Sequence, residues 1–262
     1  TEEDVRRARR AYFANISYLD AEIGALLDIL DASGQEAVIL FVSDHGDMLG
    51  ERGLWFKMSF HEGSARVPLT LHAPGVEPRR VETPVSLLDV VPTLAELAGI
   101  DLDAIAPWID GRSLLAVAGG EARGPVPMEY MAEGSVAPMI ALRDGRWKYT
   151  ACPADPEQLF DLEADPDELD NRAPAAAAGS DPQAAEALAR LRAEAARRWD
   201  LARIDAEVRA SQARRLVVYE ALRKGAYFPW DFEPLQRASE RYMRNHLDLN
   251  VLESSRRFPR GE

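Results

Sequence analysis

The fold is decided by the apolar run Val38-Ile39-Leu40-Phe41-Val42, which leads directly into Ser43-Asp44-His45-Gly46-Asp47. Five apolar residues in succession predict a strand that is buried on both faces, as in a parallel sheet covered by helices. An aspartate, a histidine and a glycine then stand where this strand would end. Because polar loop residues collect at the carboxyl ends of strands in open α/β sheets, we expect a functional site at this point.

The segments around this strand predict the rest of an α/β domain. Apolar residues recur at three- and four-residue steps between residues 5 and 30 and predict one long helix before the strand. After it, residues 48–63 contain three glycines and no clean period, which is typical of an irregular, functional loop. Residues 66–75 predict a second strand, and residues 85–98 predict a helix in which Pro92 marks a kink or the first turn.

Changes in the residue pattern along the chain predict three regions. The first, residues 1–125, holds the elements above and ends in a loop-rich stretch with one short helix. The second, residues 126–182, predicts a small antiparallel sheet, in which the turn Asp144-Gly145 joins two strands as a hairpin. The third, residues 183–262, predicts one or two amphipathic helices as far as residue 224, followed by an aromatic, irregular tail.

Composition limits the classes of protein to which the chain can belong. Its 262 residues are 47% hydrophobic and 29% charged, enough for a substantial core in one large or two small domains. It has no apolar run of the roughly 18 residues that a membrane span needs, and its first residues do not resemble a signal peptide. The single cysteine, Cys152, excludes an internal disulfide and fits a reducing environment, so we expect a cytoplasmic protein without a membrane partner.

Charge is distributed unevenly along the chain. The net charge is -13, but residues 190–262 carry 16 basic against 11 acidic side chains, a balance of +5, which leaves -18 for the remainder. A nucleic acid is therefore not expected as a partner. The basic C-terminal region predicts either solvated helix faces or a surface that docks on an acidic one.

Three side chains after the first strand could take part in catalysis or binding. Asp44 and His45 together offer a carboxylate oxygen and an imidazole nitrogen to a divalent cation, although a turn aspartate beside a satisfied histidine gives the same pattern. Lys57 stands among Trp55, Phe56 and Met58. A cation among large apolar groups can neutralise a bound anion or a leaving oxygen, but a lysine that extends along apolar surface into water has the same neighbours.

These residues resemble a known family. Ser43-Asp44-His45-Gly46, Lys57 and residues 62–68 resemble the second half of sulfatases of the alkaline phosphatase superfamily, and residues 143–149 and 159–166 resemble their C-terminal subdomain. More narrowly, residues 46–60 and 241–249 resemble the choline-sulfatase branch, and the similarity runs through essentially the whole chain. The resemblance implies part of an alkaline-phosphatase-like α/β sandwich, mainly parallel sheet with flanking helices, together with a small antiparallel sheet, a long helix and an extended tail.

The family hydrolyses sulfate esters with a formylglycine, made from a cysteine in a Cys-x-Pro-x-Arg motif, beside a divalent ion. The resemblance implies that Asp44 and His45 are metal ligands, with Ca²⁺ favoured over Mg²⁺ or Mn²⁺, and that Lys57 contacts the sulfate. Cys152 lies in Cys152-Pro153-Ala154-Asp155, which does not match the motif, and no Asp-Asp pair precedes Asp44. We therefore expect the nucleophile on sequence upstream of this chain, and no sulfatase activity from these 262 residues alone.

The choline-sulfatase resemblance also implies a substrate, choline sulfate, and a site for its quaternary ammonium. By similarity, Glu133 and Asp248 supply the carboxylates of that site; an ordinary turn residue and a surface charge are the alternatives. The tail is implied to join subunits in a homo-oligomer. Two other functions stay open: a fragment of an arylsulfatase or phosphonate monoester hydrolase, or a non-catalytic oligomerisation module.

Overall fold

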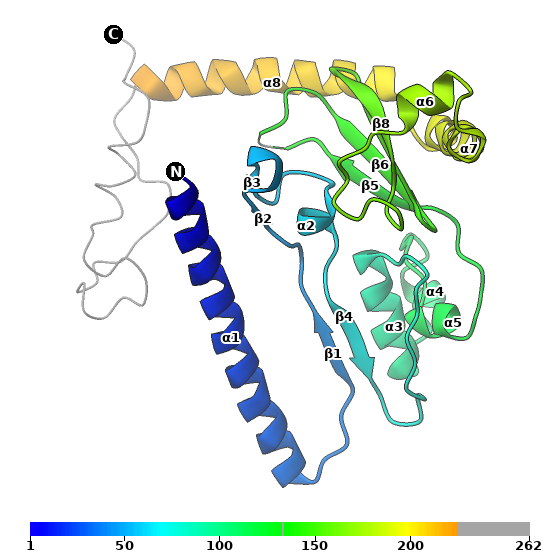
Figure 1. The fold of residues 1–262 in the computed structure, drawn as a ribbon. Coiled ribbons are helices and arrows are strands. Elements are labelled where there is room, and N and C mark those ends of the chain that lie inside the picture. The colour runs from blue at the N-terminus through cyan, green and yellow to red at the C-terminus, as the bar shows by residue number, and fades with distance from the viewer. Residues whose placement is uncertain (133, 225–262) are drawn as a thin grey trace. The chain divides into compact units, whose positions relative to one another are not determined.

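The computed structural model of the chain describes residues 1–132 and 134–224, and it separates into two units, Thr1–Ala202 and Arg203–Glu262 (Figure 1). Glu133 and Asp248, two of the predicted site residues, lie outside the described residues. Within the described part of the chain, every helix is too short or too polar to cross a membrane. The region boundaries at 125/126 and 182/183 stay predictions.

The long N-terminal helix is present as predicted. Helix α1 (Glu2–Ser33) begins with a capping box between Thr1 and Asp4, and it ends at Gly34, whose φ of 66° is the left-handed conformation that terminates helices. All of its side chains remain at least partly exposed. Its exposed apolar residues include Phe13, Ile16, Tyr18, Leu19, Leu26, Leu27 and Ile29.

The strand that follows is shorter and more open than the apolar run predicts. Strand β1 (Ile39–Val42) pairs antiparallel with β4 (Leu69–His72), and Phe41 is 41% exposed. Among the described residues, the predictions of burial on both faces and of parallel pairing are therefore wrong for this strand. An apolar run specifies that a strand avoids water but not which strand pairs with it, and here β4 is the one strand bonded to β1 among the described residues.

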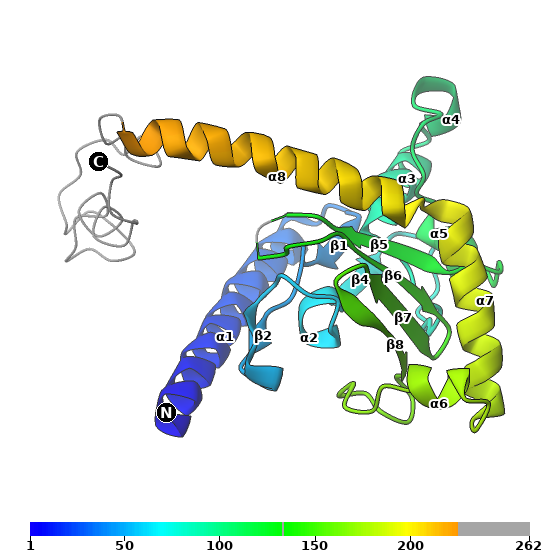
Figure 2. The same cartoon turned by 90° about the horizontal axis from the view of Figure 1, so that it is seen from above.

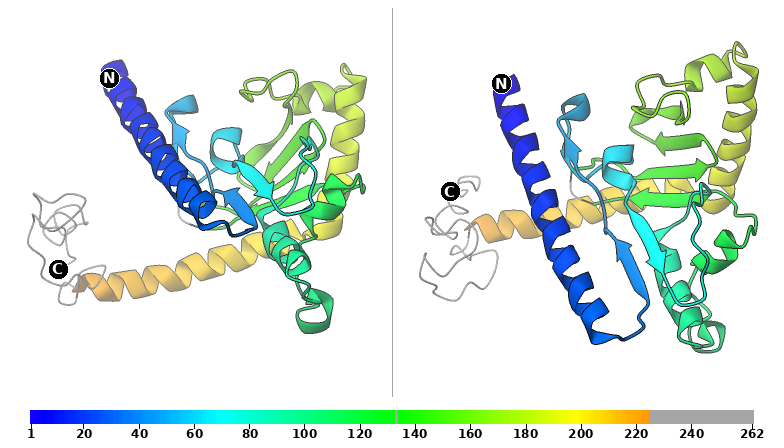
Figure 3. Two further views of the ribbon diagram at one scale, coloured as in Figure 1. Left: turned by 90° about the horizontal axis from the view of Figure 1, so that it is seen from below. Right: turned by 60° about the horizontal axis from the view of Figure 1, so that its bottom comes forward.

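The irregular loop between these strands contains four short elements. Strands β2 (Met48–Leu49) and β3 (Trp55–Phe56) form a small antiparallel ladder around the 3-10 turn η1 (Glu51–Gly53). Helix α2 (Glu62–Ala65) follows and leads into β4. Figure 3 shows β2, β3 and α2 grouped at the same end of the β1–β4 pair.

The predicted helix at 85–98 begins later than its apolar pattern. The 3-10 turn η2 (Leu87–Asp89) precedes α3 (Val90–Leu97), so that Pro92 lies in the first turn of the helix, where its missing N–H costs nothing. The stretch after it holds two short helices instead of one, α4 (Leu102–Ile105) and α5 (Leu114–Ala118). The fully buried Asp89 ties this region together, because its carboxylate accepts from Ser86 N and Arg112 N and pairs with Arg123.

The predicted antiparallel sheet is present and holds much of the core. Its strands are β5 (Val126–Tyr130), β6 (Met139–Asp144), β7 (Trp147–Cys152) and β8 (Asp155–Asp161), in that order. Helices α6 (Ala173–Ala177) and α7 (Pro182–Arg198) pack beside it (Figure 2). Helix α8 (Leu201–Lys224) extends into the second unit, where ion pairs such as Arg209–Asp205 stabilise it.

Candidate functional site

The site begins with the turn after β1, which fixes the orientation of His45. Its Nδ1 lies 2.9 Å from the carbonyl oxygen of Gly46. Because a carbonyl can only accept, Nδ1 carries the proton and Nε2 of the neutral ring keeps its lone pair. That Nε2 lies 3.3 Å from Asp44 Oδ2, while Asp44 Oδ1 accepts from the His45 backbone N–H at 2.9 Å.

Lys57 contacts His45 in the same turn. Its Nζ lies 3.0 Å from His45 Nε2, across twelve residues of the loop. The preceding Phe56 has a φ of 67°, a left-handed backbone that is uncommon for a bulky residue and that accompanies the change of direction before Lys57. The carboxylate of Asp44 is 82% exposed, so the cluster faces water in this chain.

Close backbone packing holds the two sides of the cluster together. Gly46 N donates to Ser64 O at 2.8 Å, and Ser64 Oγ donates to the carbonyl of Lys57. A side chain at Gly46 would not fit, because an added Cβ would lie 2.2 Å from the carbonyl oxygen of Gly63. Ser64 is buried, so these bonds are shielded from competing water. Ser64 thus bridges the residue after His45 and the backbone of Lys57.

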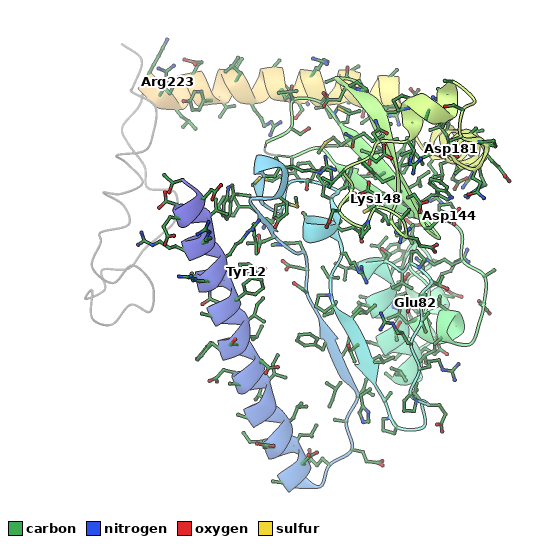
Figure 4. All side chains as sticks on the ribbon, viewed as in Figure 1. Tyr12, Glu82, Asp144, Lys148, Asp181 and Arg223 are labelled. Carbon is green, nitrogen blue, oxygen red and sulfur yellow. The ribbon has the colours of Figure 1, made fainter. Side chains whose placement is uncertain are left out.

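Helix α1 supports the same turn from the other side. Arg9 donates to the carbonyl of Leu49 at 2.9 Å and pairs with Glu51 at 3.0 Å. Partial burial, with a hydrogen bond to Asp47, raises the pKa of the Tyr12 hydroxyl above its usual value. Tyr12, on α1 (Figure 4), therefore stays neutral and contacts Asp47, which lies two residues after His45 in the sequence.

The donor atoms fit part of a cation site. Asp44 Oδ2 and His45 Nε2 are 3.3 Å apart, a separation that two ligands of one divalent ion can have, and both offer lone pairs. Among the described residues, no three histidine, cysteine, aspartate or glutamate side chains meet around one point. Asp44 and His45 would therefore hold such an ion together with ligands from elsewhere.

The loop that carries Glu133 borders this cluster. Gly134 packs against Met58, the residue after Lys57: a Cβ at Gly134 would lie 3.7 Å from Met58 Sδ. Glu133 itself and Asp248 are outside the described residues, so their placement at the site stays a prediction.

A buried ionic cluster beside the site contains none of the predicted site residues. Lys148 on β7 pairs with Glu62 at 2.9 Å and with Glu168 at 2.5 Å, and Glu168 also lies 3.3 Å from His61. Lys148 and Glu62 are 86 residues apart, so no local pattern reports their contact. The one available signal is a lysine between two aromatic residues, Trp147 and Tyr149, in a predicted strand.

Comparison with known proteins identifies the family of this chain. A family model described as "Sulfatase" matches residues 1–100, and one described as "Choline sulfatase enzyme C terminal" matches residues 206–258. Choline-sulfatase from Rhizobium meliloti (strain 1021) is 60% identical over 265 residues, which cover 100% of this chain and 51% of that protein. The chain belongs to the sulfatase family. The predicted family is thereby confirmed.

Other sulfatases and related hydrolases are similar over smaller shares. Arylsulfatase K from Gallus gallus is 36% identical over 187 residues, 65% of this chain and 34% of that protein. Phosphonate monoester hydrolase of Agrobacterium radiobacter has a TM-score of 0.60 and 30% identity, covering 74% of this chain and 43% of that structure. The predicted α/β fold class is confirmed by these neighbours. The chain spans about half the length of the choline-sulfatase, and sulfatases generally use a divalent metal and a formylglycine.

Proposed function

We propose that the complete protein hydrolyses choline sulfate to choline and sulfate. The observation that carries this proposal is the 3.0 Å contact of Lys57 with His45, which brings a cation to the Asp44-His45 turn in a chain 60% identical to a choline-sulfatase. In this proposal Asp44 and His45 are ligands of a divalent ion, with Ca²⁺ favoured over Mg²⁺ or Mn²⁺. That ion would supply Lewis-acid stabilisation of charge on the sulfate.

The roles of the chain's own residues follow from their chemistry. The Lys57 ammonium donates to a sulfate oxygen and stabilises the negative charge that grows as the S–O bond to choline breaks. The bond from His45 Nδ1 to the Gly46 carbonyl leaves Nε2 unprotonated, so that this nitrogen would be available to hold the ion. The nucleophile, a formylglycine, belongs to the part of the protein upstream of these residues.

Glu133 and Asp248 bind the trimethylammonium group of choline in this proposal. A quaternary ammonium cannot donate hydrogen bonds, so its site needs carboxylates and aromatic faces. The packing of Gly134 on Met58 supports the assignment of Glu133, because it brings the neighbouring loop against the residue after Lys57.

The test compares a cationic with a neutral substrate in the complete protein. Replacing Asp248 by Asn should raise KM for choline sulfate at least about tenfold while it leaves KM for a neutral aryl sulfate nearly unchanged. Glu82→Gln, at an exposed residue paired with Arg80, is the control for loss of one negative charge. Equal effects on both substrates would remove the choline site, and turnover of aryl sulfates or phosphonate monoesters alone would assign one of those activities instead.

The tail and the cellular location complete the proposal. The C-terminal region from residue 183 joins subunits in a homo-oligomer, and the free Cys152 suits the reducing cytoplasm. Light scattering of the complete protein, with and without residues 225–262, tests the first point. An unchanged mass after this truncation would exclude the tail as the oligomer contact.

A further inference from the structure

A buried lysine connects the four-stranded sheet to the loop that carries Lys57. Lys148 is 1% exposed on β7 (Figure 4) and its ammonium has three partners: Phe60 O at 2.7 Å, Glu62 at 2.9 Å and Glu168 at 2.5 Å. A buried ammonium is costly unless anions and acceptors surround it, and here they do. Because Phe60 O belongs to the backbone, the lysine fixes the chain at that residue and does more than balance charge.

Glu168 binds the same segment at residues 61 and 62. It is 2% exposed, and its Oε2 accepts from Glu62 N at 2.7 Å and lies 3.3 Å from His61 Nδ1. Its φ is 58°, a backbone conformation in which glycine would be less strained. Glu168 therefore has a strained backbone conformation, and the contacts of its carboxylate with residues 61 and 62 offset the cost of that strain.

The segment held in this way leads directly to the site. Residues 60–62 enter α2, whose Ser64 bonds to the carbonyl of Lys57 and, through its own carbonyl, to Gly46 N at 2.8 Å. The path therefore runs from Lys148 and Glu168, through residues 60–64, to the backbone on both sides of the Lys57–His45 contact. Each of its links is a hydrogen bond, an ion pair or a single covalent step.

We propose that Lys148 and Glu168 are positioning residues of the sulfate-ester site, which set the geometry of Lys57 and His45 without touching the substrate. This inference rests on the proposed function for its catalytic consequence, while its structural part can be tested without any substrate.

The substrate-independent test is hydrogen–deuterium exchange of the complete protein. Glu168→Gln is the variant of choice, because it keeps the shape of the side chain and leaves Lys148 with Glu62 and the carbonyl of Phe60 as partners. Exchange should rise selectively in peptides spanning residues 43–47 and 57–66. The matched control is Arg192→Gln, which breaks the pair of Arg192 with Glu157 on the same sheet, away from residues 60–64. Exchange that rises equally in both variants, or not at all, would overturn the positioning role.

The catalytic test is a double-mutant cycle between Glu168→Gln and Lys57→Ala. Glu168→Gln alone should lower kcat by about tenfold or more, within the 10²-fold that a misplaced site can cost. In the Lys57→Ala background its effect on kcat should be clearly smaller than in the wild type, because one of the two groups that it positions is already gone. Multiplicative effects would overturn the proposal. If the wild-type protein turns over no sulfate or phosphonate ester, the proposed function fails, and the exchange experiment alone decides the positioning role.

Discussion

Lys57 is one of three lysines in the chain, and the one that meets the Asp44-His45 turn. Its Nζ lies 3.0 Å from His45 Nε2, the ring nitrogen that carries no proton because Nδ1 donates to the carbonyl of Gly46. The same Nε2 lies beside the Asp44 carboxylate. A cationic donor next to two proposed ligand atoms suits an anionic ester beside a metal ion, because the ester's charge must be neutralised from more than one side.

Removing this cation should affect catalysis far more than stability. In the complete protein, Lys57→Ala should lower kcat by roughly 10²–10³-fold, the range for loss of one donor to a developing negative charge. Since Lys57 is exposed in this chain, the melting temperature should change little. Arg80→Ala, at an exposed arginine that pairs with Glu82, serves as the control and should leave kcat unchanged. Less than a threefold loss from Lys57→Ala would argue that it has no part in sulfate binding.

At the scale of elements, the turn after β1 depends on the absence of a side chain at Gly46. The Cβ of an alanine there would lie 2.2 Å from the backbone oxygen of Gly63, which cannot move without displacing Ser64. We expect Gly46→Ala to destabilise the protein by about 1–3 kcal/mol, as overpacking does, and to reduce activity by shifting His45. Chemical denaturation with activity assays on the folded enzyme measures both effects.

Gly24 provides the matched control for this substitution. It lies within α1, where an added Cβ meets nothing within 4 Å. Gly24→Ala should therefore stabilise the helix by about 0.5–1 kcal/mol, since glycine loses more backbone entropy than alanine there. If the two variants behaved alike, the close approach at Gly46 would not constrain the turn.

The ionic partners of Glu168 set the acid limit of the cluster at β7. Burial alone would raise the pKa of Glu168, but the His61 hydrogen bond and the Lys148 ammonium outweigh it, so the pKa lies below the usual value. A carboxylate with a lowered folded-state pKa stabilises the fold above its unfolded pKa and loses that contribution as pH falls through the folded one. Unfolding free energy should therefore drop on acidification below about pH 4 more steeply for the wild type than for Glu168→Gln. Parallel curves would show that the charge of Glu168 does not stabilise the fold.

The elements that the sequence predicts are those with local signals. Turn chemistry at Asp144-Gly145 predicts the β6–β7 hairpin, and Ser33-Gly34 predicts the end of α1; both are present. The apolar run at 38–42 predicts a strand but not its pairing, because periodicity reports burial and not the partner. Asp44, His45 and Lys57 could be selected from their motif and do meet in the structure, whereas the Lys148–Glu62 contact joins residues 86 apart and leaves no local trace.

At the scale of the whole molecule, the chain contains the two proposed metal ligands, Asp44 and His45, and an apolar helix surface. Every side chain of α1 is at least partly exposed in this chain, including Leu26 at 65% and Ile29 at 67%. Such a surface is normally covered by further protein. With the chain spanning about half the length of its choline-sulfatase relative, the proposed activity belongs to the complete protein and not to these residues alone.

Cation binding measures how far the site depends on the rest of the protein. Two ligands from Asp44 and His45 leave a divalent ion mostly hydrated, whereas Ca²⁺ takes six to eight oxygen ligands when it is tightly held. Calorimetric titration of these 262 residues with Ca²⁺ or Mn²⁺ should therefore show only weak binding, in the range of about 1 mM or above, and no turnover of choline sulfate. The complete protein should bind at least about a hundredfold more tightly, and Asp44→Asn should abolish the difference. Tight, stoichiometric binding by the 262 residues would mean that they hold a complete ligand set, and that Asp44 and His45 are not half of a shared one.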